Sequence, residues 1–455
     1  MMYKFLLLVS SIIVSLGFSW CDDWTHFQHD AQRTGRSPDN VGPPYTQRWN
    51  WTGGATIACG VQPIIVGGIV YIGNMNGTVY AINATNGQQV WSASNPSGTV
   101  VSGCYANNKV VFCSITGVIR CYDANTGTLQ WEYPTDGAIT GAPATNGTVV
   151  VVGSHDGHVY AVNLSNGQLA WISPDLGAQV VQAPALDNDT VYVGAENMTV
   201  YALNLSNGQI RASKHVQGQS FYQVWPVVYS SYVFIEAAPI PCIGSEWVGE
   251  TVMSSATSIS DEQDRWLQFI TAVTPGYFDS SPDWKHLTVL RRSDLSEPFI
   301  VPCAPFEGCG QPPECPVVDN QGRVLTYFKT KYPKLTQAGA RTEPIGGGSQ
   351  FGTNYALDIS AIDLATGRRI VIDNGQLSGM SNMQTDNAFG LSVGGDQLFF
   401  INDWFGYETI NLKTSAFSTL PDPGSAGPYR SARVGPAISG TGVFYPHSSG
   451  VMCAE

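Results

Sequence analysis

Short runs of alternating hydrophobic and polar residues recur along the first half of the chain. Val70–Trp91 reads VYIGNMNGTVYAINATNGQQVW, and Val110–Trp131 reads VVFCSITGVIRCYDANTGTLQW. Val150–Trp171 and Val191–Ala212 repeat the pattern, with β-branched and aromatic runs separated by Asn, Asp and Gly. Runs of four to eight such residues bounded by turn residues predict short β-strands rather than helices.

The repeat has a nearly constant length. The same turn glycine recurs in the four copies at spacings of 40, 40 and 41 residues, at Gly87, Gly127, Gly167 and Gly208. An Asn or Asp stands four residues before each glycine, where its side chain can close the turn. A further strand precedes each copy, with a proline or glycine at a fixed offset: Pro63, Gly103, Pro143 and Pro184. Four strands in about 40 residues are the signature of a β-propeller blade.

The second half of the chain contains weaker copies of the same unit. They are Val227–Glu236 with Leu287–Val301, Val317–Phe328 with Tyr355–Ile372, Ala388–Leu420, and Pro436–Glu455, which supplies only three strands. Trp49 precedes Trp91 by 42 residues and marks a strand that can complete this last blade. We therefore expect an all-β fold, a single propeller of four-stranded blades whose ring is closed by the N-terminal strand. Eight blades are favoured and seven are the alternative, with insertions near 239–283 and 329–353.

Tryptophan ends the fourth strand of several copies, where an indole can cover the joint to the next blade. The expected docking residues are Trp49, Trp91, Trp131 and Trp171. The segments AINATNGQQVW, CYDANTGTLQW and AVNLSNGQLAW resemble the pyrroloquinoline-quinone-like propeller repeats with tryptophan-docking motifs. WTHFQHDAQRTGRSP, from Trp24 to Pro38, also looks like the N-terminal segment usual in that family. The resemblance is clear over residues 24–212 and weaker beyond them.

The N-terminus has the pattern of a secretory signal peptide. Lys4 is followed by the mostly apolar run Phe5–Phe18, and small residues near Ser19 suggest cleavage there. A bilayer-spanning helix needs about 20 apolar residues, so an anchor is less favoured. Lipidation at Cys21 is an alternative that the bulky Trp20 fits poorly. We expect residues 1–19 to be removed, and residues 20–455 to form one secreted, soluble propeller domain.

Eight Asn-x-Ser/Thr sequons agree with a secretory route, and all lie before residue 205. They are Asn50, Asn76, Asn83, Asn146, Asn163, Asn188, Asn197 and Asn204. Glycosylation of several is expected. The alternative is that Asn, Ser and Thr occur here as ordinary turn residues.

Ten cysteines in an exported chain favour disulfides. Cys113 and Cys121 replace two small residues of the other copies, so a cross-strand disulfide between them is expected. Cys21 and Cys453 both map to the closing blade, where a bond would lock the ring and contribute about 4–5 kcal/mol in the chain-entropy model. The alternative is that Cys21 stays free or pairs elsewhere. Pairing stays open for Cys59, Cys104, Cys242, Cys303, Cys309 and Cys315. Zinc is the second interpretation of the cluster near residue 309, although its spacing differs from C-x-x-C.

Charge and histidine patterns give little evidence for other activities. Lys plus Arg number 22 against 35 Asp plus Glu, so the formal charge is −13 and no basic footprint for nucleic acid is present. Two histidine pairs, His26 with His29 and His155 with His158, are candidate metal ligands. Residues 26 and 29 point to opposite faces of a strand, and the second pair spans an Asp-Gly turn. No metal site is predicted.

The resemblance leaves two functions to compare. Enzymes of the family hold pyrroloquinoline quinone at the ring centre with a calcium ion bound by Glu and Asn. They often carry a vicinal Cys-Cys disulfide and a haem-binding C-x-x-C-H. Neither motif is present in this chain. We therefore expect a secreted, non-catalytic binding or assembly scaffold with no cofactor and no catalytic residue. A calcium- and quinone-dependent dehydrogenase of alcohols or sugars is the alternative, and a hydrolase or lyase propeller is a third, weaker one. The expected partner is an extracellular protein or glycan, with neither nucleic acid nor a membrane span involved, and self-assembly stays open.

Overall fold

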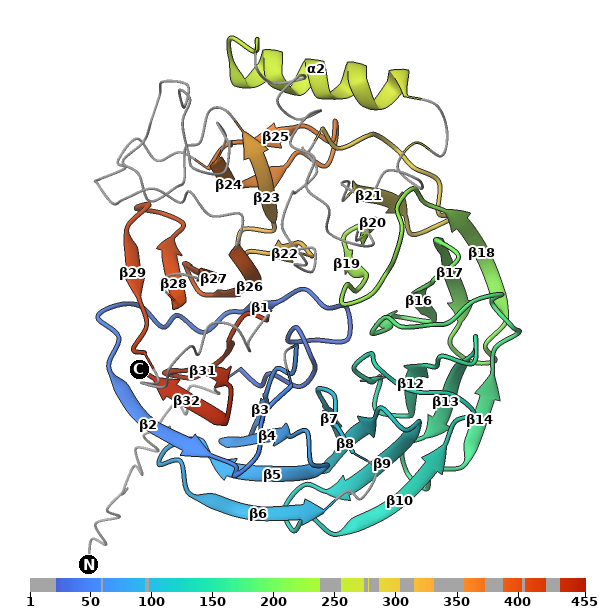
Figure 1. The fold of residues 1–455 in the computed structure, drawn as a ribbon, viewed down its shortest axis with the longest axis vertical. Helices are drawn as coiled ribbons and strands as arrows, with labels where there is room; N and C mark the ends of the chain where they lie inside the picture. Colours follow the sequence, from blue (N-terminus) through green and yellow to red (C-terminus); the bar gives the residue numbers. More distant parts are fainter. Residues whose placement is uncertain are drawn as a thin grey trace, which may run out of the picture.

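Eight β-sheets stand around a central axis and form a closed propeller (Figure 1). The computed structural model describes residues 22–58, 60–94, 98–237, 255–273, 277, 286–302, 315–330, 356–372, 388–402, 406–422 and 434–455. The expected eight-bladed all-β fold is confirmed. The predicted signal peptide and most of both insertions lie outside the described residues.

The first four blades follow the sequence repeat, and each contains four antiparallel strands. Blade 1 contains β3 (Ile64–Val66), β4 (Ile69–Gly73), β5 (Thr78–Asn83) and β6 (Gln89–Ser94). Blade 2 contains β7 (Cys104–Ala106), β8 (Lys109–Ser114), β9 (Val118–Asp123) and β10 (Leu129–Pro134). Blade 3 contains β11 (Ala144–Thr145), β12 (Val149–Gly153), β13 (Val159–Asn163) and β14 (Leu169–Ile172). Blade 4 contains β15 (Ala185–Asp187), β16 (Thr190–Ala195), β17 (Thr199–Asn204) and β18 (Ile210–His215).

The remaining blades are less regular. Blade 5 has three described strands, β19 (Val227–Tyr229), β20 (Tyr232–Ala237) and β21 (His286–Arg291). Blade 6 contains β22 (Val317–Val318), β23 (Val324–Thr330), β24 (Ala356–Ile362) and β25 (Arg369–Ile370). Blade 7 contains β26 (Ala388–Gly394), β27 (Gln397–Asn402), β28 (Gly406–Asn411) and β29 (Phe417–Thr419). Blade 8 contains β30 (Ala437–Ser439), β31 (Gly442–His447) and β32 (Gly450–Ala454). Helix α2 (Ile259–Ala272) lies within the first insertion.

The N-terminal part of the chain contributes to the last two blades. Strand β2 (Gln47–Thr52) pairs antiparallel with β32 and places Trp49 opposite Cys453, which confirms closure of the ring by the N-terminal strand. The short strand β1 (Arg36–Ser37) pairs parallel with β26 in blade 7, a contact that the repeat pattern did not predict. Closure leaves the ring itself without a gap between its first and last blades.

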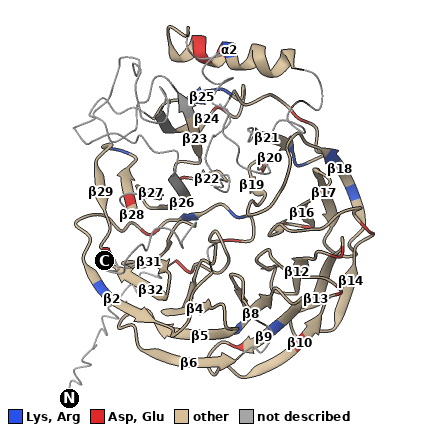
Figure 2. Cartoon of the chain, viewed as in Figure 1, with Lys and Arg blue, Asp and Glu red and all other residues tan. Residues whose placement is uncertain are grey.

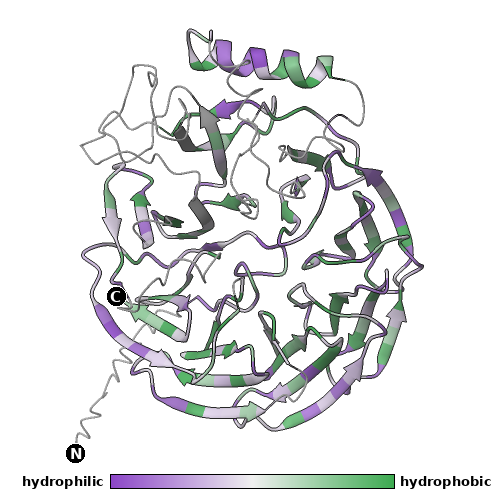
Figure 3. Cartoon of the chain, viewed as in Figure 1, coloured by the Kyte–Doolittle hydropathy of each residue, from purple (hydrophilic) through white to green (hydrophobic). Residues whose placement is uncertain are grey.

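Apolar side chains concentrate on the inner three strands, and the outer strands are more hydrophilic (Figure 3). In β6, β10 and β14, the single buried residue is the tryptophan, respectively Trp91, Trp131 and Trp171. Burial of apolar surface between neighbouring blades therefore holds the ring together, and these three outer strands contribute to it mainly through one indole each.

Each docking indole lies against the next blade. The indole nitrogens of Trp49, Trp91, Trp131 and Trp171 donate hydrogen bonds of 2.8–2.9 Å to the carbonyls of Ala84, Ala124, Leu164 and Leu205. The rings also cover the turn glycine of that blade. A Cβ built on Gly167, whose φ is +71°, would lie 2.6 Å from the Trp131 ring. At the joint between blades 5 and 6, Phe299 takes the place of the docking tryptophan and lies against Gly367 of blade 6.

The two faces of the ring differ in their connections. The turn from first to second strand contacts the turn from third to fourth strand, as in the bond from the Ala124 amide to the Asn108 carbonyl. We call this side the turn face. On the opposite side, the loop from second to third strand meets the connection between blades, as in the bond from the Ile115 amide to the Thr99 carbonyl. We call this side the connection face. The strands that flank residues 238–285 and 331–355 open onto it, because both gaps join a second strand to a third.

Candidate functional site

Residues 22–40, which we call the axial segment, cross the centre of the ring instead of passing outside it (Figure 1). Backbone hydrogen bonds join this segment to the innermost strands of successive blades. The contacts run from Trp24 to Ile65 in blade 1, from Ala31 to Leu186 in blade 4, from Gln32 to Val228 in blade 5, from Thr34 to Val318 in blade 6 and from Gly35 to Val393 in blade 7. The chain's own backbone therefore occupies the axis and satisfies inner-strand groups that face it.

Arg33 is the central side chain of this segment, and it is fully buried. Its guanidinium donates to the carbonyls of Phe27, Ala142, Pro143 and Pro184 at 2.8–3.1 Å. Burial lowers the Arg33 pKa to about 10, although Cys104 and Asp30 act in the opposite direction. The guanidinium joins the axial segment to blades 3 and 4 through carbonyl dipoles.

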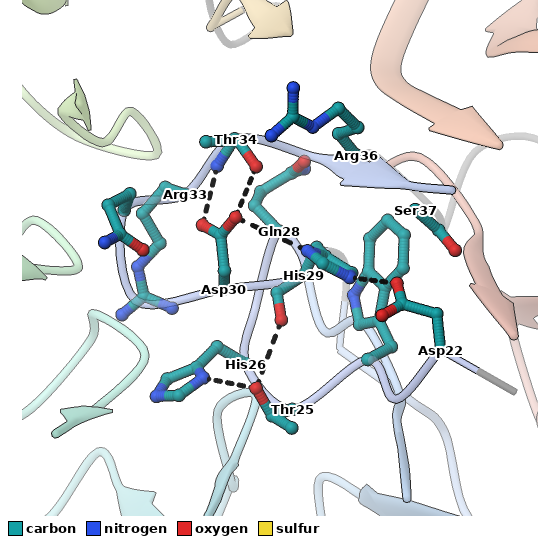
Figure 4. Close-up of polar contacts among 12 residues, drawn as sticks. Asp22, Thr25, His26, Gln28, His29, Asp30, Arg33, Thr34, Arg36 and Ser37 are labelled. Atoms are coloured by element: carbon teal, nitrogen blue, oxygen red, sulfur yellow. Dashed lines mark hydrogen bonds and ion pairs between the residues drawn. The ribbon is translucent and has the colours of Figure 1, made fainter. Parts of the chain in front are cut away.

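An acid–base cluster lies beside Arg33 (Figure 4). The His29 Nε2 lies 2.6 Å from the Asp22 carboxylate, and its Nδ1 lies 3.4 Å from Asp30. Burial opposes protonation of His29, but the two carboxylates outweigh it and raise its pKa to about 9. Burial also raises the pKa of Asp30, yet the bonds from His29 and Thr34 leave it below its usual value. His29 therefore carries a positive charge at neutral pH.

His26 behaves in the opposite way, because burial and the nearby Arg33 lower its pKa to about 3. It is neutral at physiological pH and lies against the backbone of Thr145 in blade 3. His155 and His158 contact Thr140 and Ser173 respectively. Among the described residues, no group of three or more His, Cys, Asp or Glu side chains is placed to hold a metal ion.

Gln62 connects three parts of the hub. Its side-chain oxygen accepts hydrogen bonds from the Trp24 indole and the Gln28 amide, and its nitrogen donates to Gly435 in the connection to blade 8. Gln28, His29 and Arg33 have φ of +57°, +75° and +64°. Non-glycine residues adopt this left-handed region rarely and at some cost in energy, so the surrounding contacts impose the path of the segment.

A pocket opens above the axial segment on the connection face. Its walls come from the connections that precede the inner strands of blades 1–5 and 8, and Phe27 of the axial segment is part of its lining. The cavity volume is about 240 Å³. Every described residue that lines it is uncharged. Positive charge is sparse over the rest of the described ribbon as well, where few residues are Lys or Arg (Figure 2).

The sequons occupy both faces. Asn83, Asn163 and Asn204 lie in third-to-fourth-strand turns of the turn face, where they are partly buried, and Asn146 and Asn188 are exposed in neighbouring turns of the same face. Asn76 and Asn197 are exposed on the connection face, and Asn50 is exposed on β2. Several side chains also serve the turns: the Asn163 nitrogen donates to Gln168, and the Asn197 nitrogen donates to Leu176.

The expected Cys113–Cys121 disulfide is absent, and both residues are free, buried thiols. The prediction required the two cysteines to face each other across the β8–β9 hairpin. The register shows otherwise, because Cys113 lies opposite Ile119 and Cys121 lies opposite Val111. Cys104 also lies opposite Val111, so blade 2 contains three buried thiols.

Cys453 is buried in β32 and forms no disulfide with any described residue. Its expected partner Cys21 lies outside the described residues, as do Cys59, Cys242, Cys303 and Cys309. A bond between Cys21 and Cys453 therefore stays a prediction.

Sequence reasoning noticed Trp24–Pro38 only as a family-like segment and did not identify its role at the hub. Arg33, Gln62 and the pocket were missed because their contacts join residues far apart in the chain. Nothing along the sequence distinguishes Arg33 from Arg36, which lies three residues later in the same segment.

These features define an eight-bladed propeller whose centre is filled by its own chain. Comparison with known proteins supports this class of fold. The family model described as outer membrane protein assembly factor BamB matches residues 46–103 and 75–235, together less than half of the chain. The match places repeats of this family within residues 46–235 of the chain.

The curated relatives are outer membrane protein assembly factors named BamB. That of Yersinia pestis is 29% identical over 110 residues, covering 23% of this chain and 28% of the relative. That of Moranella endobia is 24% identical over 133 residues, covering 26% and 34%. The matched part spans about a third or less of these relatives' length.

Solved structures agree on the fold. The quinohemoprotein alcohol dehydrogenase from Comamonas testosteroni has a TM-score of 0.58 at 14% identity, over 95% of this chain and 80% of that one. A europium-containing methanol dehydrogenase has a TM-score of 0.54 at 14% identity, over 90% and 86%. The computationally designed Ika8 protein has 0.53 at 13% identity, over 90% and 99%. At these identities the likeness shows the fold alone.

Proposed function

We propose that this protein is a secreted, non-catalytic propeller scaffold that holds a protein partner on its connection face. The observation that carries the proposal is the axial segment, which fills the ring centre with buried, internally bonded side chains. A rigid ring with a filled axis presents surfaces rather than a reaction chamber. The relatives are named as assembly factors, which also supports a scaffold function.

The connection face is the better candidate for the partner. The turn face has short strand-to-strand turns and five of the eight sequons, at Asn83, Asn146, Asn163, Asn188 and Asn204. The connection face receives the ends of the strands that flank both long insertions, and the pocket opens there. Loops held by a rigid scaffold are the usual location of binding residues.

The residues at the hub do not fit a quinone with calcium, which was the alternative. Pyrroloquinoline quinone carries several carboxylates and needs cationic partners, and calcium needs carboxylate or carbonyl oxygen ligands. The described pocket walls supply neither a cation nor a carboxylate. Arg33 is a buried cation of the axial segment, and its donors already bond to backbone carbonyls. The charged His29 of the same segment is held by the carboxylates of Asp22 and Asp30. We therefore propose that no quinone is bound at the hub.

Secretion and glycosylation are part of the same proposal. None of the helices in the described ranges is long and apolar enough to cross a bilayer. Asn146 is exposed in a turn that its own side-chain oxygen helps to close, so its sequon presents a favourable site. The measurement is the mass of the exported protein before and after removal of N-glycans. An unchanged mass would exclude glycosylation while leaving the scaffold proposal intact.

Site-specific photocrosslinking tests the partner face. A photoreactive amino acid is placed at Ile115 or Tyr222 on the connection face, and at Asn108 or Asn125 on the turn face as matched controls; all four are exposed. The expected result is one shared crosslinked polypeptide from the first pair and none from the second. Crosslinks from the turn face alone, or from neither face in the native secretion environment, would contradict the proposal. Calorimetric titration with pyrroloquinoline quinone and calcium is expected to show no binding.

A further inference from the structure

The hub pocket, defined by its floor at Phe27 and its rim at Ile115 and Tyr222, has the composition of a ligand site. Connections from several blades converge on it, including Val101 of blade 2 and Val181 of blade 4. Its volume of about 240 Å³ is close to the lower limit of pockets that hold small molecules, roughly 300 Å³. The space is therefore suited to a compact molecule.

Aromatic side chains form much of one side of this pocket. Phe27 and Trp225 pack edge to face, with their ring centroids 4.7 Å apart. Tyr222 at the rim is 54% exposed, the highest value among the large hydrophobic side chains of the described residues. Gln223, which follows Tyr222 directly, has a φ of +61°, a left-handed conformation that is unfavourable for a residue other than glycine. The backbone next to Tyr222 is therefore strained. Strained backbone of this kind is frequent at ligand sites.

Two hydroxyl groups of the pocket wall already have protein partners, whereas the buried indole nitrogen of Trp225 has none among the described residues. The Thr140 hydroxyl lies 2.9 Å from His155 and donates to the Val181 carbonyl, and the Ser102 hydroxyl accepts a bond from the Gln62 amide. No described lining residue carries a charge. A charged ligand would lose its hydration there without compensation, whereas an apolar ligand would gain by leaving water.

We propose that the hub pocket binds a small, uncharged, apolar molecule with an aromatic or branched aliphatic group. Such a ligand would lie against Phe27, Val101 and Tyr222, above the axial segment. The pocket shares Ile115 and Tyr222 with the proposed partner face, but ligand binding is tested on the isolated chain and so does not depend on a partner being present.

A neutral fluorescent probe, N-phenyl-1-naphthylamine, tests this proposal on the full secreted chain. Its emission rises in apolar surroundings, and the variants described below localise it. The expected result is saturable binding of one probe per chain. Neutral indole is expected to displace it, and pyrroloquinoline quinone is not. Absence of saturable binding, or displacement by the quinone, would overturn the proposal.

Two variants localise the probe. Val101→Asp places a charge in the pocket wall and is expected to weaken binding at least tenfold, whereas Val90→Asp, at a 50% exposed position on the outer strand β6, is expected to leave it unchanged. Equal effects of the two substitutions would contradict the assigned site. Tyr222→Ala changes an exposed side chain and keeps the test valid if Val101→Asp does not fold. It is expected to weaken binding several-fold, and unchanged affinity would overturn the rim contact.

Discussion

Arg33 shows how a single residue can organise the ring centre. Its guanidinium is buried without a carboxylate in direct contact and is held by backbone carbonyls from the axial segment and two blades. A buried cation is costly unless its donors are satisfied, and here five hydrogen bonds to four carbonyls satisfy them. The arrangement is therefore sensitive to replacement by any side chain with fewer donors.

Arg33→Met is expected to lower the free energy of unfolding by about 3 kcal/mol or more, because buried carbonyls lose their donors. Urea denaturation measures the change. Arg211→Met is the matched control, since this side chain is 35% exposed and pairs with the exposed Asp189. Its expected cost is below about 1 kcal/mol. Similar losses in both variants would mean that Arg33 is not a structural centre.

His29 makes the stability of the fold depend on pH. Its folded pKa of about 9 exceeds the unfolded value of 6.5, so its contribution is complete below pH 6.5 and is lost as the pH rises through 9. His29→Gln is expected to cost on the order of 2 kcal/mol at pH 6 and little at pH 10. Unfolding free energies of wild type and variant at both pH values give the difference, with the exposed His215→Gln as control. A difference that does not change with pH would contradict the assignment.

His26 should act in the opposite pH range. Its folded pKa of about 3 lies below 6.5, so its neutral form contributes stability above pH 6.5. That contribution is lost as the pH falls below 6.5 toward 3, because the unfolded chain then binds the proton first. Together the two histidines place the stability maximum of this segment near pH 6.5.

At the scale of elements, four outer strands each pack against the next blade through a docking indole. β10 buries only Trp131, which covers Gly167 and donates to the Leu164 carbonyl of blade 3. The same geometry at three other joints explains why the repeat combines a terminal tryptophan with a turn glycine. Where the indole is absent, a different side chain such as Phe299 fills the space.

Trp131→Ala is expected to destabilise the protein by about 3–5 kcal/mol, because it removes a large buried side chain and its hydrogen bond. Gly167→Ala should also destabilise it, since the added methyl group would overlap the same indole and φ is +71°. Leu169→Ala, at a 41% exposed position nearby, is the control with little expected effect. Thermal unfolding compares the three. A neutral Gly167→Ala would show that the indole does not pack closely on the turn.

At the scale of the whole molecule, the ring depends on pairing between the two ends of the chain. β2 and β32 are joined by main-chain hydrogen bonds, and Asn50 lies opposite Met452 in this ladder. The axial segment that precedes β2 contacts the inner strands of blades 1 to 7. Separation of β2 would therefore expose sheet edges and also loosen the hub.

Thr46→Pro is expected to lower stability by about 3 kcal/mol and to favour association through the exposed edges, because proline removes the Thr46 amide that donates to the Glu455 carbonyl at 2.9 Å beside β2. Thr46→Ala is the matched control, because it removes the same side chain but keeps the backbone bond. Chemical unfolding and light scattering provide the measurements. Equal stability of the two variants would contradict closure by β2.

The sequence by itself determined the strands, the blades and the closure of the ring. These depend on local information: alternating hydrophobicity, a glycine at the left-handed turn position and a repeat of about 40 residues. The register across blade 2 was not available in this way. A two-residue offset separates Cys113 from the residue opposite Cys121, and so the expected disulfide is replaced by free thiols.

Only the tertiary structure decided what occupies the ring centre. Arg33 reaches carbonyls 109 to 151 positions away in the chain, and Gln62 bonds to Gly435 at a separation of 373. These residues do not belong to the repeated positions, so the period that predicted ring closure does not record their contacts. The pocket likewise exists only where connections from several blades converge, so its neutral lining becomes apparent in the folded ring and not along the sequence.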